Sequence, residues 1–137
     1  MSERDEVPDT RTLAFIYDRH ATTATAALDE RTDRCRRYAA AKGWTVAGTW
    51  VDRGDHALTD APRPQWAALA LAMRQAAAPA VCLVDSWERI SRDPERRAVL
   101  CRAVRQARGY CATTAGEMDR DPDRDIAAAV VALRGRP

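Results

Sequence analysis

The sequence contains very little lysine. Lys42 is the only one among 137 residues, so arginine supplies nearly all of the positive charge. The formal net charge at pH 7 is only +2. Proteins that bind DNA strongly without sequence preference usually carry a clear basic excess, and this chain has none. A role with nucleic acid therefore has to rest on a local group of charges or on a partner.

Long apolar runs and paired metal-binding cysteines are also missing. No run approaches the roughly 18 apolar residues of a membrane helix, and no charged-then-apolar leader opens the chain. We therefore expect a soluble, cytoplasmic protein that does not bind membranes. Its four cysteines, at positions 35, 82, 101 and 111, match no zinc-binding spacing. We expect them to be reduced and mostly buried, and we expect no metal and no cofactor.

Apolar runs and helical patterns alternate along the chain, which predicts an α/β fold. Strands are expected at 13–17, 44–51, 81–84 and 110–114, and helices at 25–42, 65–77, 94–108 and 126–133. This order is typical of three layers, with helices on both faces of a mostly parallel sheet of four to five strands. Right-handed crossovers then place the first and third strands side by side.

Turn and cap residues mark the ends of these helices. Gly43 and Gly109 are expected to end the first and third helices. Asp93, followed by Pro94, is typical of a helix start, with Asp as the cap and Pro at the first helical position. The segment 52–64, which contains Gly54 and two prolines, is expected to be a loop.

The segment 81–93 carries the clearest chemical signal. Its apolar run is followed by a polar turn that contains Arg89 and Arg92, and Arg19 follows the first apolar run in the same way. Ligands of open parallel sheets bind beyond the carboxyl ends of the strands. Adjacent first and third strands would bring the three arginines to one edge, where their guanidinium groups suit a phosphate. The alternative is solvated surface arginines, paired with Asp85, Glu88 and Asp93.

Several segments, taken in order, resemble the catalytic domain of the serine site-specific recombinases, the resolvase/invertase family. Residues 16–22 resemble the motif Tyr-x-Arg-Val-Ser-Thr, and residues 83–93 resemble Asp-Arg-Leu-Ser-Arg. Between them, residues 35–44 resemble the first helix and second strand, and residues 52–64 resemble the mobile loop and its Arg-Pro. The resemblance extends over positions 13–117 and favours an inherited anion site over ordinary surface arginines.

The resemblance implies a chemistry in which a serine hydroxyl attacks a DNA phosphodiester and forms a phosphoserine link. Arginines, without a metal, neutralise the phosphate in the transition state. The family's arginine positions correspond to Arg19, Arg89 and Arg92, and the Arg-Pro motif adds Arg63 to the expected phosphate-binding residues. The acidic position of the third motif is Glu88, one methylene longer than the family's Asp.

The predicted activity depends on the positions where this sequence differs from the family's motifs. The nucleophilic serine corresponds to Ala21, which has no hydroxyl. We therefore predict a degenerate domain that keeps a phosphate or DNA-backbone site but does not cleave strands. Thr22 or Thr23 is the alternative nucleophile, although a hydroxyl displaced by one residue points away from the phosphate. His20 replaces a valine, and the family's glutamine falls near Arg31.

The expected domain organisation is a tail at 1–12, a catalytic-type domain at 13–118 and a short helical stub at 119–137. The family's long helix and DNA-binding domain are not expected, so DNA binding is expected to be weak. The expected protein partner is a second copy of the chain or a partner recombinase. Two other functions stay open. One is a non-enzymatic dimerisation or regulatory module, and the other is a repurposed enzyme that acts on a small phosphorylated ligand.

Overall fold

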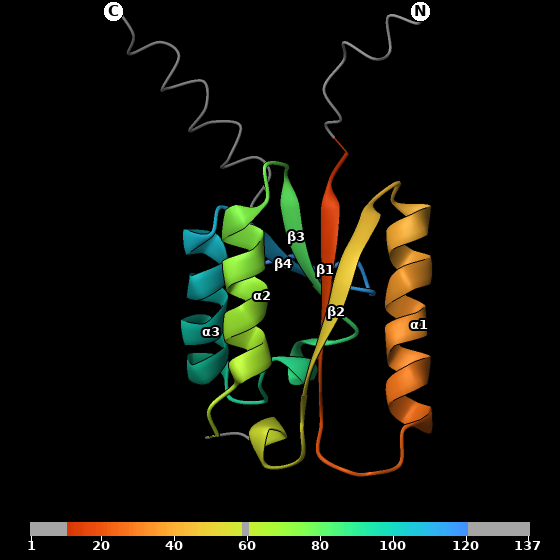
Figure 1. Cartoon of the computed structure of the whole chain (residues 1–137), viewed down its shortest axis with the longest axis vertical. Helices are drawn as coiled ribbons and strands as arrows, with labels where there is room; N and C mark the ends of the chain where they lie inside the picture. The colour runs from red at the N-terminus through yellow and green to blue at the C-terminus, as the bar shows by residue number, and fades with distance from the viewer. Residues whose placement is uncertain (1–10, 59–60, 121–137) are drawn as a thin grey trace, which may run out of the picture.

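The computed structural model describes residues 11–58 and 61–120, and these form a three-layer α/β fold (Figure 1). The strands are β1 (Leu13–His20), β2 (Thr45–Arg53), β3 (Ala80–Val84) and β4 (Tyr110–Thr113). The helices are α1 (Ala26–Ala41), α2 (Pro64–Gln75) and α3 (Pro94–Gln106), with the short 3-10 turns η2 (Gly54–Ala57) and η3 (Trp87–Arg89) between them. The predicted helix at 126–133 and most of the predicted tail lie outside the described residues.

The sheet is parallel throughout its described part, with the strand order β2-β1-β3-β4. The prediction that the first and third strands are neighbours is confirmed, because Leu13 pairs with Ala80 and Ile16 pairs with Leu83. The four described strands agree with the predicted size of the sheet. All their carboxyl ends therefore meet at one edge, where Arg19 lies in the last part of β1 and Arg89 and Arg92 follow β3.

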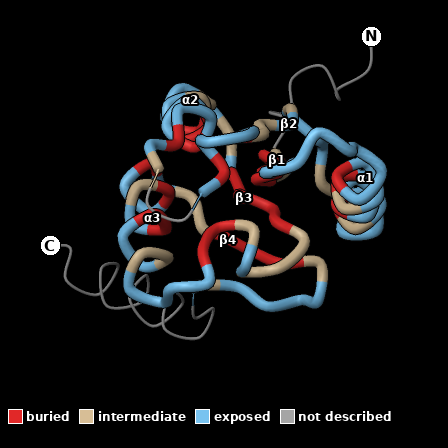
Figure 2. Tube along the Cα trace, turned by 90° about the horizontal axis from the view of Figure 1, so that it is seen from below, coloured by how far each residue is buried: buried red, intermediate tan, exposed pale blue. Residues whose placement is uncertain are grey.

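Helices cover both faces of the sheet, as expected from strands that are apolar on both sides. Helix α1 packs on one face, and α2 and α3 pack on the other (Figure 1). Within β1, Ala14 and Ile16 face α1, whereas Phe15 and Tyr17 belong to the core under α2 and α3. Seen from below, the buried strands lie between exposed helix surfaces (Figure 2).

Strand β1 continues three residues beyond its predicted end, to His20. The polar sequence after Tyr17 predicts a turn, but the ladder with β2 extends until His20 pairs with Arg53. Asp18, Arg19 and His20 are all buried in this stretch. Their polar atoms bind partners from other elements, so the chain can stay extended without leaving buried polar groups unsatisfied.

Two of the three predicted helix ends are confirmed. Gly43 has a φ of +74°, a left-handed conformation that suits glycine, directly after α1. The Asp93 carboxylate accepts a hydrogen bond of 3.0 Å from the Glu95 amide and so caps α3, and Pro94 is the first helical residue.

The expectation that Gly109 caps α3 is wrong. The residue with a positive φ is Arg108, at +66°, and Gly109 follows it. Glycine at position 109 has a packing reason instead. A Cβ there would lie 2.2 Å from Met73 Cε and 3.0 Å from the Ala80 carbonyl oxygen. Gly109 therefore lets the turn after α3 approach α2 and the start of β3.

Substitution of Gly109 by alanine is expected to destabilise the fold by about 1–3 kcal/mol, because the added methyl group overpacks a site bounded by main chain. Urea denaturation of the single variant measures this change. In a Met73→Ala background the same substitution should cost less, since the nearest clashing atom is gone. A Gly109→Ala protein as stable as the parent would contradict the close approach.

The described part of the chain also bears on the predicted thiols and on membrane contact. All four cysteines are free and buried, as predicted. Among the described residues, no helix has the length and apolar character to cross a membrane.

Candidate functional site

A pocket of about 350 Å³ opens at the carboxyl edge of the sheet, where β1 ends and the turn after β3 begins. It is lined by Arg19, Ala21, Ala57, Leu58, Arg89 and Arg92. The structure thus brings together the three arginines that sequence reasoning placed at one edge, and it places Ala21 beside them. Ala57 and Leu58, from the loop after β2, complete the wall and were not anticipated.

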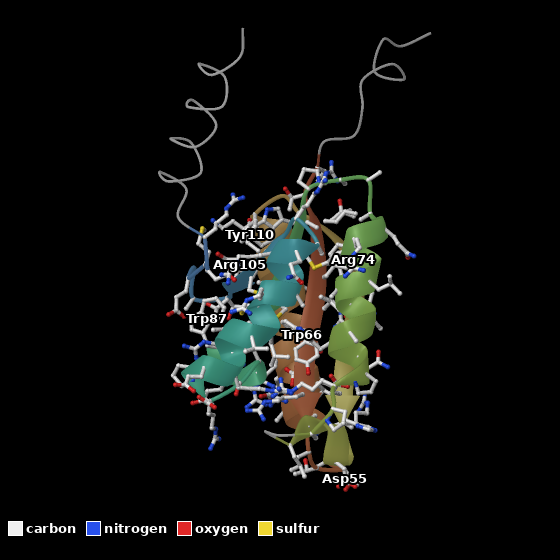
Figure 3. All side chains as sticks on the ribbon, turned by 90° about the vertical axis from the view of Figure 1, so that its left-hand side faces the viewer. Asp55, Trp66, Arg74, Trp87, Arg105 and Tyr110 are labelled. Atoms are coloured by element: carbon white, nitrogen blue, oxygen red, sulfur yellow. The ribbon has the colours of Figure 1, made fainter. Side chains whose placement is uncertain are left out.

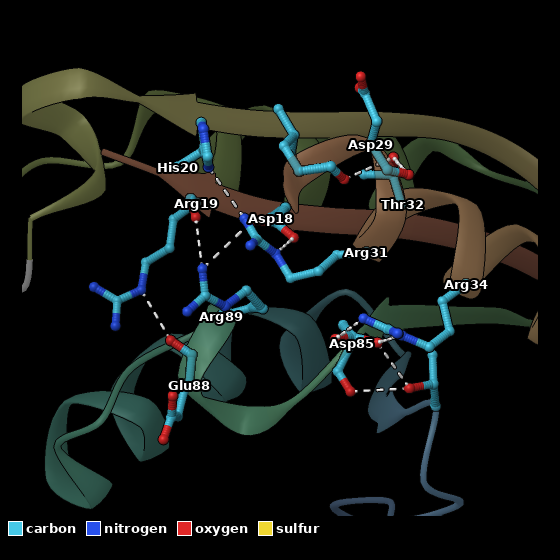
Figure 4. Close-up of polar contacts among 12 residues, drawn as sticks. Asp18, Arg19, His20, Asp29, Arg31, Thr32, Arg34, Asp85, Glu88 and Arg89 are labelled. Carbon is cyan, nitrogen blue, oxygen red and sulfur yellow. Dashed lines mark hydrogen bonds and ion pairs between the residues drawn. The ribbon is translucent and has the colours of Figure 1, made fainter. Parts of the chain in front are cut away.

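Arg19 is the most rigidly held of the three arginines. Its Nε donates to the Glu88 carbonyl oxygen at 2.9 Å (Figure 4). Its Nη1 donates to the Ala57 carbonyl oxygen at 3.0 Å. Burial, and after it the nearby charges of Arg63 and Arg89, lower the pKa of Arg19. The side chain remains charged, because a guanidinium is not deprotonated in proteins. Arg19, Arg63 and Arg89 therefore place positive charges close to one another at this edge of the sheet.

Arg89 is held by the main chain of β1. Its Nη1 donates to the Arg19 carbonyl oxygen at 3.0 Å and lies 3.8 Å from the buried Asp18 carboxylate (Figure 4). Arg19 in turn binds the carbonyl of Glu88, which precedes Arg89 in η3. The end of β1 and the turn η3 are therefore linked by two reciprocal side-chain to main-chain hydrogen bonds.

Arg92 and Glu88 are the exposed members of the predicted set. The Arg92 side chain is 74% exposed, and its Nε lies 3.9 Å from the Glu88 carboxylate, which is 60% exposed. A pair this exposed contributes little to stability, so Arg92 can turn toward an anion at small cost. The Glu88 carboxylate does not line the pocket, and its carbonyl oxygen is the atom that contacts Arg19.

Arg63 lies behind the pocket and does not line it. It is buried, and its Nη1 donates to the Ile90 carbonyl oxygen. Its Nε and Nη2 are also buried and have no hydrogen-bond partner among the described residues. From this position Arg63 adds positive charge near Arg19.

Two buried carboxylates that sequence reasoning did not single out hold the site in place. Asp18 binds Arg31 of α1 through two hydrogen bonds, of 2.8 and 2.9 Å, and this contact raises the pKa of Arg31. Asp52 accepts a hydrogen bond of 2.7 Å from the Tyr17 hydroxyl and two more from amides at the start of α2. The signal available in the sequence was an Asp at the end of each strand, β1 and β2.

The threonines beside Ala21 do not line the pocket. Thr22 Oγ1 lies 3.1 Å from His20 Nε2, which resembles a nucleophile beside a base. However, Arg31 donates to His20 Nδ1 at 3.2 Å, and Nε2 contacts the Ala24 carbonyl oxygen, which can only accept. His20 Nε2 therefore has two oxygen neighbours, the Thr22 hydroxyl and the Ala24 carbonyl.

No cysteine lines the pocket, and the buried thiols are poor nucleophiles. Burial raises the pKa of Cys35 to about 12, so this thiol stays protonated near neutral pH. Within the described part of the chain, the only groups that the pocket offers to an anion are thus its arginines and main chain.

The comparison with protein families gives one match, which covers residues 14–134 and is described as "Resolvase, N terminal domain". No curated protein matches the chain significantly.

Solved structures share the fold at low sequence identity. The N-terminal catalytic domain of TP901-1 integrase is 22% identical, with a TM-score of 0.65, and the alignment covers 88% of this chain and 92% of that one. A resolvase family site-specific recombinase from Streptococcus pneumoniae is 14% identical, with a TM-score of 0.67 and coverages of 90% and 88%. An IS607-like serine recombinase, over its C-terminal catalytic domain, is 16% identical, with a TM-score of 0.61 and coverages of 88% and 79%.

Because the family match spans most of the chain, and the fold is that of recombinase catalytic domains, this chain belongs to the resolvase family of serine recombinases, as a homologue of their N-terminal catalytic domain.

Proposed function

We propose that this protein is a recombinase catalytic-domain homologue that binds a phosphate of the DNA backbone but does not cleave the strand. One observation carries the proposal: Ala21 lines the same pocket as Arg19, Arg89 and Arg92. The arginines supply the charge that a phosphodiester needs. The side chain at the position of the family's attacking oxygen is a methyl group, which cannot form an ester.

The neighbouring hydroxyl groups support the loss of cleavage. Thr22 and Thr23 do not line the pocket, and the Thr22 hydroxyl bonds to His20 and to the Ala24 carbonyl. A nucleophile needs a base that accepts its proton, and the His20 nitrogen that faces Thr22 also contacts the Ala24 carbonyl oxygen, which can only accept a hydrogen bond. The proposal therefore includes the statement that neither Thr22 nor Thr23 replaces the missing nucleophile.

The experiment is a search for a covalent protein–DNA adduct on suicide substrates, with a DNA-binding domain supplied by fusion. The parent chain should give no adduct that survives denaturing electrophoresis. A complete serine recombinase on its own site serves as the positive control. An adduct linked through phosphoserine or phosphothreonine would overturn the proposal.

Arg92→Ala is expected to weaken binding to DNA in the same fusion without unfolding the protein. The Arg92 side chain is largely exposed, and its ion pair with Glu88 is long. Loss of one phosphate contact should reduce the slope of log K against log salt concentration by about one. Fluorescence anisotropy at several salt concentrations measures it. Arg102→Ala, an exposed arginine of α3 that does not line the pocket, is the matched control and should leave the slope unchanged.

A small phosphorylated ligand is the second candidate occupant, because the pocket volume of about 350 Å³ lies at the lower end of small-molecule sites. Thermal-shift measurements with nucleotides and inorganic phosphate separate the two. Stabilisation by a nucleotide, lost in Arg92→Ala and not matched by phosphate, would favour the small ligand. A melting temperature that changes with none of these compounds would argue against the small phosphorylated ligand.

Partners, domain limits and location are part of the same proposal. The family acts on DNA as dimers, and we extend this to a homodimer or a pairing with a complete recombinase. A domain at 13–118 and a cytoplasmic location stay predictions, and four free cysteines are what a reducing compartment would maintain.

A further inference from the structure

A second group of reactive side chains lies away from the arginine pocket, between α3 and β4. It consists of Cys101 on α3, Cys111 on β4 and Asp119 in the segment that returns along β4. Their sulfur and oxygen atoms all lie within 4.8 Å of one another. The spacing of the cysteines in the sequence gives no sign of this group, because each member comes from a different element.

The return segment is firmly attached to β4, so the three side chains are held together by the fold. The Asp119 amide donates to the Cys111 carbonyl oxygen at 3.0 Å, and the Cys111 amide donates to Asp119 Oδ1 at 2.7 Å. Asp119 Oδ2 is buried and has no hydrogen-bond partner among the described residues. Arg105 Nη1 forms an ion pair with this oxygen at 3.8 Å. One carboxylate oxygen is therefore oriented by the main chain while the other is left for a ligand.

From this juxtaposition we propose that Cys101, Cys111 and Asp119 form a binding site for a thiophilic divalent cation of the zinc type.

The geometry suits such an ion. Two sulfur ligands in a tetrahedral zinc site stand about 3.8 Å apart, and a sulfur and an oxygen about 3.6 Å, given the usual bond lengths. Ligand atoms already within 4.8 Å need to close by only about 1 Å to reach that arrangement. Three protein ligands leave a fourth position for water or for a further donor.

The charges also balance. Each thiol that becomes a thiolate releases one proton to the solvent, so two thiolates, one carboxylate and a divalent cation together carry one negative charge. Arg105 and Arg97 both line the adjoining pocket and offset that charge. The Arg105 side chain is 49% exposed, so it can move away from Asp119 when a cation takes its place.

The cation has a route from solvent. A pocket of about 340 Å³ is lined by Cys101 and Asp119 together with Trp87, Pro94, Arg97, Ala98 and Arg105. Figure 3 shows Trp87 and Arg105 on the side of the molecule where α3 lies. A third thiol, Cys82, is hydrogen-bonded to Cys111, and neither of these two cysteines lines the pocket. Cys111 is reached from the pocket through Cys101 and Asp119, whose ligand atoms lie within 4.8 Å of its sulfur.

The test is a titration of the reduced, chelator-treated full chain with Cd²⁺, followed by the ultraviolet thiolate-to-cadmium absorption band. One equivalent should saturate the band, and Zn²⁺ should compete. Asp119→Asn keeps the Oδ1 acceptor for the Cys111 amide and removes the charge, and Cys101→Ala removes a sulfur. Each should weaken binding at least about tenfold, since even outer groups around a metal are worth that much.

Cys35→Ala is the matched control, because Cys35 is buried on the opposite face of the sheet. It should leave the affinity unchanged. If circular dichroism shows that Cys101→Ala does not fold, the affinity of Asp119→Asn for Cd²⁺ is the deciding measurement. The absence of a band, an unchanged affinity in Asp119→Asn, or equally tight binding by the urea-unfolded chain would each overturn the proposal.

Discussion

Ala21→Ser is expected to give a domain that forms a covalent link to DNA, which we propose that the parent chain does not form. Position 21 lines the pocket beside the three arginines, so a serine Oγ would enter the space where a bound phosphate lies. Loss of a nucleophile removes several orders of magnitude of rate in enzymes of this kind of covalent chemistry. We therefore expect the adduct yield of the variant to exceed that of the parent by at least about a hundredfold.

The measurement uses the same suicide substrates and the same fused DNA-binding domain as the parent assay. Thr22→Ser is the matched control, because it offers a primary hydroxyl one residue away and outside the pocket. It should give no adduct. Adding Arg89→Ala to Ala21→Ser should abolish the regained adduct, since the developing charge loses a stabilising group. An inactive Ala21→Ser protein that still binds the DNA would show that the nucleophile is not the only missing part.

Arg31→Ala is expected to destabilise the fold by about 3 kcal/mol, because it leaves the buried Asp18 carboxylate without its bidentate partner. The Asp18 side chain is 2% exposed, and its other cation, Arg89, lies 3.8 Å away. The free energy of unfolding from urea denaturation measures the change.

Arg34→Ala is the matched control. Arg34 is on the same helix and makes the same two-bond contact with a carboxylate, Asp85, at 2.7 and 3.1 Å (Figure 4). Its side chain is 51% exposed, and Asp85 also accepts from the Thr114 hydroxyl. This substitution should change stability much less than Arg31→Ala does, because an exposed ion pair contributes little. Equal losses for the two variants would mean that burial does not set the value of these ion pairs.

The sequence was sufficient to predict the fold because its signals are local and repeated. Apolar runs of strand length alternate with helical patterns, and one crossover rule then makes β1 and β3 neighbours. The grouping of Arg19, Arg89 and Arg92 around one pocket follows from that adjacency. No side-chain detail is needed for this step, because Arg19 lies at the carboxyl end of β1, and Arg89 and Arg92 lie in the segment after β3.

Features that depend on long-range partners were not predictable in the same way. The extension of β1 to His20 requires Arg31 of α1 to meet Asp18, and no local pattern encodes that contact. The positive φ after α3 falls on Arg108, whereas Gly109 is needed because Met73 packs closely against it. The sequence does not show this contact.

The roles of individual atoms were equally hidden from the sequence. Glu88 was expected to act through its acid group, whereas its main-chain oxygen contacts Arg19. The grouping of Cys101, Cys111 and Asp119 arises only when α3 packs beside β4. Sequence periodicity reports which face a residue occupies, and it does not report which atom of that residue meets a partner.

The reciprocal bonds between Arg19 and the η3 main chain, and between Arg89 and the β1 main chain, have a consequence for substitutions at position 21. Neither bond involves the side chain of residue 21. A hydroxyl group can therefore be added or removed at that position without breaking the contacts that hold Arg19 and Arg89 in place. The side chain at position 21 and the placement of these two arginines can change independently of each other.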